Sequence, residues 1–458
     1  MTLKQFFAPT DMTKGTPWKR IVYFTLPMLI GNIAQQLYST VDSVVVGRYI
    51  GDNALASVGS TLPVLNMLLV LFVGIATGAN IMVSQYYGAK NREGLSYAVG
   101  NGITATAVCC VALILVGAPL IRPLLVLLNT PASILDGCVE YLTISLVGMA
   151  GLAYYNMLSG ILRGFGDSFS ALIYLLVATV LNIGLDIFFV AVIKMGIGGV
   201  ALATVLAQFI SSVLCFIKLT KLREQFDIDW KYLKPKKEYL QTLIRLGLPS
   251  GLTQAIFSSA MIVVQSLTNQ FGEQFIAANV VVMRVDGFAM MPNLSFGTAL
   301  TTYAGQNVGA KRLDRVVKGA KQGTLLAVLC SATITGVILL FGKGLMGIFT
   351  ETTALVEQSY YLMKILAVGY IAMAVTQSLS GIMRGAGDTM TPMWISLINT
   401  VLLRVPLAYG ISYFTRTETL PNGRCECIQI SLLITWVLGA VITALFYLRG
   451  KWKDKAIQ

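Results

Sequence analysis

Twelve long apolar stretches run through this chain, separated by polar segments or by breaks at glycine and proline. A helix needs about 20 residues to cross a bilayer, and each stretch reaches that length. Backbone groups in lipid must find partners within the segment, so the stretches are predicted to be helices, and none alternates like a barrel strand. We therefore predict an all-α membrane protein of twelve transmembrane helices. The predicted spans lie near 20–47, 53–82, 95–118, 137–161, 168–192, 199–218, 241–270, 275–303, 317–341, 356–382, 390–414 and 428–448.

Composition supports a membrane protein. Hydrophobic residues make up 55% of the chain and charged residues only 12%, whereas soluble domains carry about 25% charged residues. The chain has no histidine, so neither an imidazole zinc site nor a histidine proton relay is expected. Cys425 and Cys427 are separated by one residue, which is poor spacing for a zinc knuckle. We expect no structural metal.

The basic residues predict the orientation in the membrane. With the N-terminus in the cytoplasm, most of the 34 lysines and arginines fall in segments that face the cytoplasm. The basic residues of the outer loops are then Arg48, Arg122, Lys194, Lys343, Arg416 and Arg424. The positive-inside rule predicts that both termini are cytoplasmic in a cell membrane protein. The net charge of +13 is thus a topology signal, with room for anionic-lipid contacts, and not a nucleic-acid footprint.

The two halves of the chain repeat each other. The segment 158–167 reads LSGILRGFGD and the segment 379–388 reads LSGIMRGAGD, with eight of ten positions identical. At the same spacing, Gln85 to Lys90 returns as Gln306 to Lys311. We therefore predict an N-lobe at 1–218, a cytoplasmic linker at 219–240 and a C-lobe at 241–458.

Six spans per half give both halves the same membrane orientation. We expect two six-helix bundles related by a pseudo-two-fold axis along the membrane normal, with a substrate site between them and alternating access by rocking. The repeated Arg-Gly-x-Gly-Asp segments are predicted to be tight turns, each clamped by an Arg/Asp pair and acting as a structural hinge. Their residues are Arg163, Gly164, Gly166 and Asp167, and Arg384, Gly385, Gly387 and Asp388.

Ionisable residues at membrane depth are costly and mark candidate functional sites. In the first half, Asp42 follows Tyr38 by one helical turn, and Asp186 follows Asn182 by one turn. Asn156 and Thr204 add neutral oxygens from two further spans.

Together these groups could hold a hard cation, or a proton if the carboxylates are desolvated. The alternative is that the two carboxylates are interfacial and that Asn156 and Thr204 only join helices.

The second half has no matching pair of carboxylates. Its charged residues at membrane depth are Arg284, Asp286, Lys364 and Arg404. Arg284 and Asp286 point to different helix faces, so each needs its own partner. Asp286 and Arg404 could form a structural ion pair, or they could gate the substrate, and the sequence leaves both interpretations open.

Several motifs give the chain a resemblance to a known family. They are Val41-Asp42-Ser43 with Val46-Gly47-Arg48, the segment 85–90, the two glycine turns, the segment 182–186 and Arg404-Val405-Pro406-Leu407. Over nearly its whole length the chain resembles the multidrug and toxic compound extrusion (MATE) family, in its prokaryotic DinF-like form.

The resemblance implies a secondary active transporter that exports cationic, amphiphilic compounds in exchange for H⁺ or Na⁺, without another cofactor and as a monomer. It places the coupling-cation site of the N-lobe at Tyr38, Asp42, Asn156, Asn182, Asp186 and Thr204. The span at 241–270 lacks an acidic residue, which departs from NorM-like members and leaves Asp286 as the C-lobe carboxylate candidate.

The sequence gives less support to other functions. A lipid-linked saccharide flippase of the same superfamily is the alternative, but such proteins tend to have a strongly cationic cavity. An enzyme is not expected, since the chain has no histidine, nucleophile elbow or phosphate-binding loop. A channel would not need a duplicated two-lobe architecture.

Overall fold

The computed structural model describes residues 9–128 and 130–457. The side chains of 38–45, 47, 48, 52, 53, 55, 56, 59, 62 and 63 also lie outside the described part. Within it the chain is helical and forms no β-strand beyond one isolated bridge, Thr417 to Leu420. This confirms the predicted all-α class, and the helices follow the predicted spans closely.

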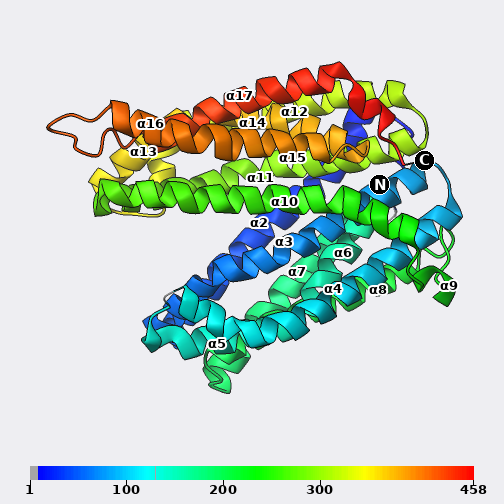
Figure 1. Ribbon diagram of the computed structural model, residues 1–458, viewed down its shortest axis with the longest axis horizontal. Coiled ribbons are helices and arrows are strands. Elements are labelled where there is room, and N and C mark those ends of the chain that lie inside the picture. The colour runs from blue at the N-terminus through cyan, green and yellow to red at the C-terminus, as the bar shows by residue number, and fades with distance from the viewer. Residues whose placement is uncertain (1–8, 129, 458) are drawn as a thin grey trace. The chain divides into compact units, whose positions relative to one another are not determined.

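The helices of the first half run from the N-terminus to the linker (Figure 1). They are α2 (Pro17–Tyr49), α3 (Asp52–Gly88), α4 (Arg92–Leu127), α5 (Ala132–Val147), α6 (Met149–Gly164), α7 (Ser168–Asp186), the π-helical η1 (Ile187–Val192), α8 (Ile197–Thr220) and the short α9 (Trp230–Leu233).

The second half repeats this order of elements. Its helices are α10 (Lys237–Thr268), the 3₁₀ turn η2 (Asn269–Phe271), α11 (Glu273–Gly309), α12 (Leu313–Gly347), α13 (Thr353–Ala367), α14 (Gly369–Gly385), α15 (Met390–Leu397), the π-helical η3 (Ile398–Leu403), α16 (Arg404–Phe414), α17 (Cys427–Arg449) and the 3₁₀ turn η4 (Lys451–Asp454).

Two spans are bent at equivalent places in the repeat. The pair α5 and α6 bends by 47°, and the pair α13 and α14 bends by 45°. The described residues contain nine helices that are long and apolar enough to cross a membrane, or up to eleven if each bent pair is one span. The first predicted span, 20–47, falls on α2.

The chain forms two compact units. The first unit comprises Met1–Asp11 and Leu26–Gly251, and the second comprises Met12–Thr25 and Leu252–Gln458. The linker and the first turns of α10 therefore belong to the first unit, while the first turns of α2 belong to the second. The lobe boundaries at 218 and 241 remain a prediction from the sequence.

The repeated glycines bring equivalent helices into close contact in both units. A Cβ atom at Gly160 of α6 would lie 2.6 Å from the carbonyl oxygen of Ala76 in α3. Its counterpart, a Cβ at Gly381 of α14, would lie 2.2 Å from the carbonyl oxygen of Gly297 in α11. Only glycine permits this approach of two helix backbones in a membrane protein. The sequence repeat is therefore also a repeat of helix packing.

The turns after these helices have the predicted form. Gly166 has φ +90° and Gly387 has φ +101°, a left-handed conformation that glycine adopts without strain. The predicted Arg/Asp clamp is wrong for the first turn, because Asp167 forms its ion pair with Lys218 at 3.3 Å. Asp167 also accepts hydrogen bonds from the backbone N–H and the hydroxyl of Ser170 at 2.9 and 2.7 Å, as the N-cap of α7.

The clamp is absent from the second turn as well. Asp388 accepts hydrogen bonds from the backbone N–H and hydroxyl of Thr391, at 3.2 and 2.8 Å. Both aspartates thus hold the start of the next helix, where their negative charge is favourable.

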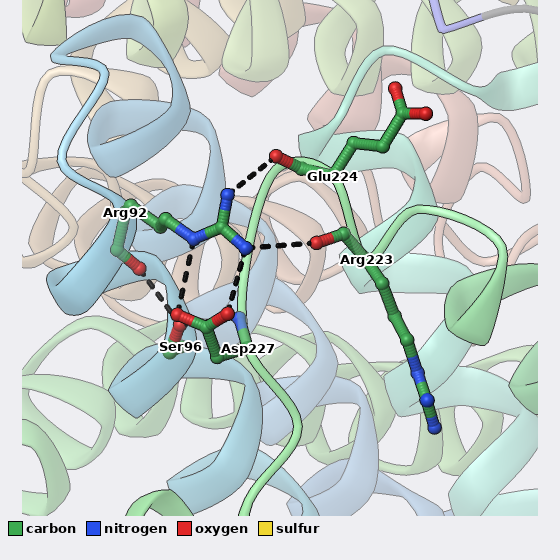
Figure 2. Close-up of polar contacts among 5 residues, drawn as sticks. All are labelled: Arg92, Ser96, Arg223, Glu224 and Asp227. Atoms are coloured by element: carbon green, nitrogen blue, oxygen red, sulfur yellow. Dashed lines mark hydrogen bonds and ion pairs between the residues drawn. The ribbon is translucent and has the colours of Figure 1, made fainter.

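The linker is fixed to the start of α4 by a dense set of polar contacts (Figure 2). Arg92 donates to both carboxylate oxygens of Asp227, at 3.1 and 2.7 Å, and to the carbonyls of Glu224 and Arg223, at 2.7 and 3.1 Å. The backbone N–H of Asp227 donates to the hydroxyl of Ser96 at 2.8 Å. The hydrogen bonds from Arg92 lower the pKa of Asp227 below its usual value.

The segment before α2 is held in a similar way within the second unit. The backbone N–H of Met12 donates to the side-chain oxygen of Gln306 at 2.9 Å, and the carbonyl of Met12 accepts from Asn307 at 3.1 Å. Arg315 donates to Asn307 at 3.0 Å and to the carbonyl of Met12 at 3.2 Å. The start of each half is therefore anchored by side chains and not left as a free tail.

The glycine contacts make a testable prediction about stability. We expect Gly381→Ala to destabilise the protein by about 1–3 kcal/mol through overpacking. Gly336 of α12 is the matched control, since a Cβ there meets nothing within 4 Å. Gly336→Ala should be neutral or stabilising by up to about 1 kcal/mol, because alanine has the higher helix propensity. Thermal unfolding of both purified variants in detergent measures this, and equal effects would contradict the packing role.

Candidate functional site

Three of the predicted first-half residues meet between α7 and α8. Asn182 and Asp186 lie one turn apart on α7, and their exposed fractions are 1% and 0%. With the Asn182 amide in the orientation that satisfies its neighbours, its nitrogen donates to a carboxylate oxygen of Asp186 at 2.9 Å. Its oxygen accepts from the backbone N–H and the hydroxyl of Thr204, at 3.2 and 3.3 Å.

This arrangement gives Asp186 a buried setting with neutral groups. A carboxylate taken out of water is costly unless a cation, a proton or several donors compensate its charge. The Asn182 amide supplies one donor, and Thr204 fixes the orientation of that amide. The structure thus brings together three of the residues that the sequence analysis proposed, and their binding of a proton or a cation stays a prediction.

The structure does not join the other predicted members of the site to these three residues. Asn156 lies half-buried on α6, and its amide nitrogen donates to the carbonyl of Leu152 at 2.9 Å in its own helix. The side chains of Tyr38 and Asp42 lie outside the described residues, although α2 carries both positions. Their role at the site remains a prediction.

In the second unit, Asp286 has a different partner from the one considered. The hydroxyl of Tyr370 on α14 donates to Asp286 on α11 at 2.8 Å. Tyr370 is fully buried, and its ring lies 5.6 Å from that of Trp436. Tyr370 has no counterpart in the first half, where the same register holds Met149, so the repeat could not reveal it.

Arg404 is buried in the second unit. Only 6% of it is exposed, and one guanidinium nitrogen lies 3.8 Å from the sulfur of Met261. Its Nε has no hydrogen-bond partner among the described residues. Among the described residues no direct ion pair joins it to Asp286, but the two opposite charges lie close enough to attract each other.

Two further basic residues predicted at depth lie outside this cluster. Arg284 is exposed on α11. Lys364 is also exposed, with its ammonium group 4.8 Å from the ring centre of Tyr360. Of the predicted second-half charges among the described residues, Arg404 is buried and Asp286 is half-buried.

A π-helical segment adjoins the ionisable residue in the fifth span of each half. In the first half η1 begins directly after Asp186, and in the second half η3 ends directly before Arg404. Insertions of this kind within helices occur often at functional sites, because they realign side chains and loosen the backbone hydrogen bonds. The fifth span therefore contains a π-helical segment in both halves, although at the repeat spacing η3 aligns with residues 177–182 and not with η1. The adjoining charges are opposite in sign.

A further polar network in the second unit escaped sequence reasoning. Asn293 is fully buried on α11, donates to the carbonyl of Tyr370 at 3.2 Å and accepts from the hydroxyl of Ser331 on α12 at 2.7 Å. It joins three helices by satisfied hydrogen bonds, as buried polar groups in membrane bundles do. Pro292 beside it was the available signal, since proline in a span often frees backbone groups.

Comparison with known proteins supports the duplication directly. The MatE family matches the chain twice, over residues 27–188 and 249–410. Each match begins at the proline inside the first helix of its half and ends in the fifth span.

Relatives align over nearly the whole chain. The chain is 30% identical to the probable multidrug resistance protein YoeA of Bacillus subtilis, over 97% of this chain and 96% of that protein. It is 26% identical to the probable multidrug resistance protein NorM of Thermotoga maritima, over 96% and 94% of the two chains. It is 22% identical to the multidrug export protein MepA of Staphylococcus aureus, over 93% and 95%.

Solved structures share the fold. A crystal structure of MATE in complex with MaL6 superposes with a TM-score of 0.90 at 24% identity, covering 97% of this chain and 99% of that one. A transporter of the MOP superfamily from Pyrococcus furiosus gives a TM-score of 0.89 at 24% identity, over 98% and 100%. This likeness, the two family matches and the relatives lead to one conclusion: the chain belongs to the multidrug and toxic compound extrusion (MATE) family of multi-pass membrane transporters.

Proposed function

We propose that this protein is a secondary active multidrug efflux transporter that exchanges organic cations for protons. The relatives named above are described as multidrug resistance and export proteins, which supports the substrate class. The observation that carries the mechanism is the hydrogen bond from Asn182 to Asp186, with the Asn182 amide held in turn by Thr204.

The orientation of the Asn182 amide favours a proton over a sodium ion. A sodium site is built from several oxygens directed at one point. Here the amide oxygen is turned to Thr204, and the amide nitrogen donates to Asp186. An N–H group is not a ligand for Na⁺, whereas a buried carboxylate beside a neutral amide can be neutralised by a proton.

Exchange of drug for proton follows if the two ligands compete for the same carrier. A transporter that releases its proton when the drug binds, and releases the drug when the proton binds, couples the two fluxes through their opposite preferences for the two conformations. Asp186 is our candidate for the proton carrier of the first half, together with Asp42 as predicted from the sequence.

Neutralising Asp186 should uncouple the transporter. Asp186→Asn keeps the size of the side chain, and its oxygen can still accept from Asn182, so the variant should fold. We expect gradient-driven efflux of an organic cation from proteoliposomes to fall by about 5- to 150-fold. This is the factor, about 5- to 150-fold, that corresponds to typical coupling free energies between two ligands. Asp286→Asn is the matched control, because Asp286 contacts Tyr370 in the other unit, and it should retain most activity. Wild-type transport by Asp186→Asn would refute the first-half site.

The identity of the coupling ion can be tested without changing any residue. Proteoliposomes with an imposed pH gradient and no sodium should drive uptake of the organic cation at the full rate. A sodium gradient at equal pH on both sides should drive none. The reverse result would mean that the amide of Asn182 turns its oxygen to the site and that sodium is the coupling ion.

A second candidate function rests on Arg404. A buried guanidinium with a free N–H suits an anionic group, and a lipid-linked saccharide carries one, so a flippase of the same superfamily remains the alternative. Two observations favour cation export: a half-buried carboxylate, Asp286, lies in the same unit and attracts Arg404, and the relatives are named as multidrug resistance and multidrug export proteins.

The charge of Arg404 distinguishes the two functions. If the substrate is an organic cation, Arg404→Gln should leave its apparent affinity unchanged or raise it, because a like charge is removed. If the substrate is a lipid-linked saccharide, the same change should abolish its movement. Reconstituted vesicles given each substrate decide the matter, and saccharide transfer by the wild type that needs Arg404 would replace our proposal.

We also propose that both termini and the linker are cytoplasmic, in the cell membrane, as the positive-inside rule predicts. The loop before α17 is then external. Cys425 lies in that loop and is half-buried, and burial raises the pKa of its thiol above the usual value.

Cys425 offers a direct test of orientation. An impermeant maleimide should label it in intact cells, faster as the pH rises, because the thiolate is the reactive form and the raised pKa keeps it scarce at neutral pH. Cys425→Ser should remove the signal. A cysteine introduced at Lys234 of the linker should react only after the cells are opened. Labelling of the linker alone in intact cells would invert the topology.

A further inference from the structure

The linker carries a short basic segment with an exposed tryptophan. Residues 230–237 read WKYLKPKK, with four lysines and no acid. Trp230, the first residue of α9, is 80% exposed, which is unusual for so large an apolar ring in a segment otherwise well anchored. Acidic residues flank the segment at Asp229 and Glu238.

The segment is fixed against the side of α4 and not left as a free loop. The side chain of Asn101 donates to the carbonyl of Tyr232 at 3.3 Å and accepts from the backbone N–H of Lys236 at 2.8 Å. The hydroxyl of Thr104 donates to the carbonyl of Leu233 at 2.6 Å. In Figure 1, α9 lies where α8 ends and α4 begins, and the contacts at Arg92 in Figure 2 tie down the preceding residues.

Aromatic contacts decide which side chains of the segment face α4. The ring of Tyr232 packs edge-on against Tyr97 with centres 4.8 Å apart, and the ammonium of Lys236 lies 4.4 Å above Tyr97. These two side chains are directed to the protein. Trp230 and the lysines at 231, 234 and 237 remain exposed.

The depth of α9 in the membrane follows from its position along α4. On α4, Val108 is the first large apolar side chain that is exposed, at 61%, and residues 94–102 before it are buried. Thr104 precedes Val108 by one turn, about 6 Å. From Thr104 to Arg122 the helix rises about 27 Å, close to the ~30 Å of a hydrocarbon core. The surface that α4 exposes to lipid therefore begins close to Asn101 and Thr104, although the apolar stretch in the sequence starts near residue 95, since residues 94–102 are buried within the unit.

From this placement we propose that α9 is a membrane-surface anchor, with Trp230 in the headgroup layer and the lysines at 231, 234 and 237 bound to anionic phospholipid headgroups. Tryptophan concentrates at the membrane interface because its ring is amphipathic. Clustered lysines at the same level attract anionic lipids. The hydrogen bonds to Asn101 and Thr104 hold the segment at this depth.

The position of Trp230 can be measured by fluorescence quenching in nanodiscs of mixed phosphatidylcholine and phosphatidylglycerol. The emission of Trp230 is obtained by subtracting the fluorescence spectrum of Trp230→Phe from that of the wild type. This variant should fold, because the side chain of Trp230 is exposed. We expect this difference to be quenched by a spin label on the lipid headgroup and protected from aqueous iodide. Quenching by iodide alone would place Trp230 in water and overturn the proposal.

The lysines are tested by the lipid that co-purifies with the protein. Replacing the lysines at 231, 234 and 237 with glutamine should lower the enrichment of phosphatidylglycerol over phosphatidylcholine about fivefold or more. The control replaces the exposed lysines at 451, 453 and 455, which removes the same charge elsewhere. Equal enrichment in the wild type and both triple variants, or an equal loss in both variants, would contradict a specific role for α9.

Discussion

The bilayer offers no water to backbone or side-chain polar groups, and this constraint shapes the whole molecule. Backbone groups are satisfied within helices, which explains why the chain is helical across both units. Charges at depth are few, and each needs a chemical reason to be there. Helices cannot be driven together by the hydrophobic effect in lipid, so they rely on close backbone contact and on satisfied polar networks.

Gene duplication supplied one scaffold and divergence gave its halves different chemistry. Gly160 and Gly381 make equivalent backbone contacts, the bends recur at equivalent places, and the fifth span of each half contains a π-helical segment. The fifth span nevertheless holds a carboxylate, Asp186, in one half and a guanidinium, Arg404, in the other. The two halves therefore share their helix packing and differ in the sign of the charge on the fifth span.

Much of this could be predicted from the sequence, because the signals are local or repeated. Span lengths set the helices, the one-turn spacing joined Asn182 to Asp186, and the duplication exposed the glycine turns. Contacts between distant segments could not be predicted. Tyr370 as the partner of Asp286, Lys218 as the partner of Asp167 and the docking of α9 on α4 all depend on which helix faces meet. The orientation of the Asn182 amide depends on Thr204, a residue in another helix.

The account depends most on the claim that a proton on Asp186 and an organic cation compete for the carrier. Purified protein in weakly buffered detergent solution offers the most direct measurement: the protons released when an organic cation is added. We predict release by the wild type and a much smaller release by Asp186→Asn at saturating ligand. Binding without proton release in the wild type, or equal release by both proteins, would contradict the account.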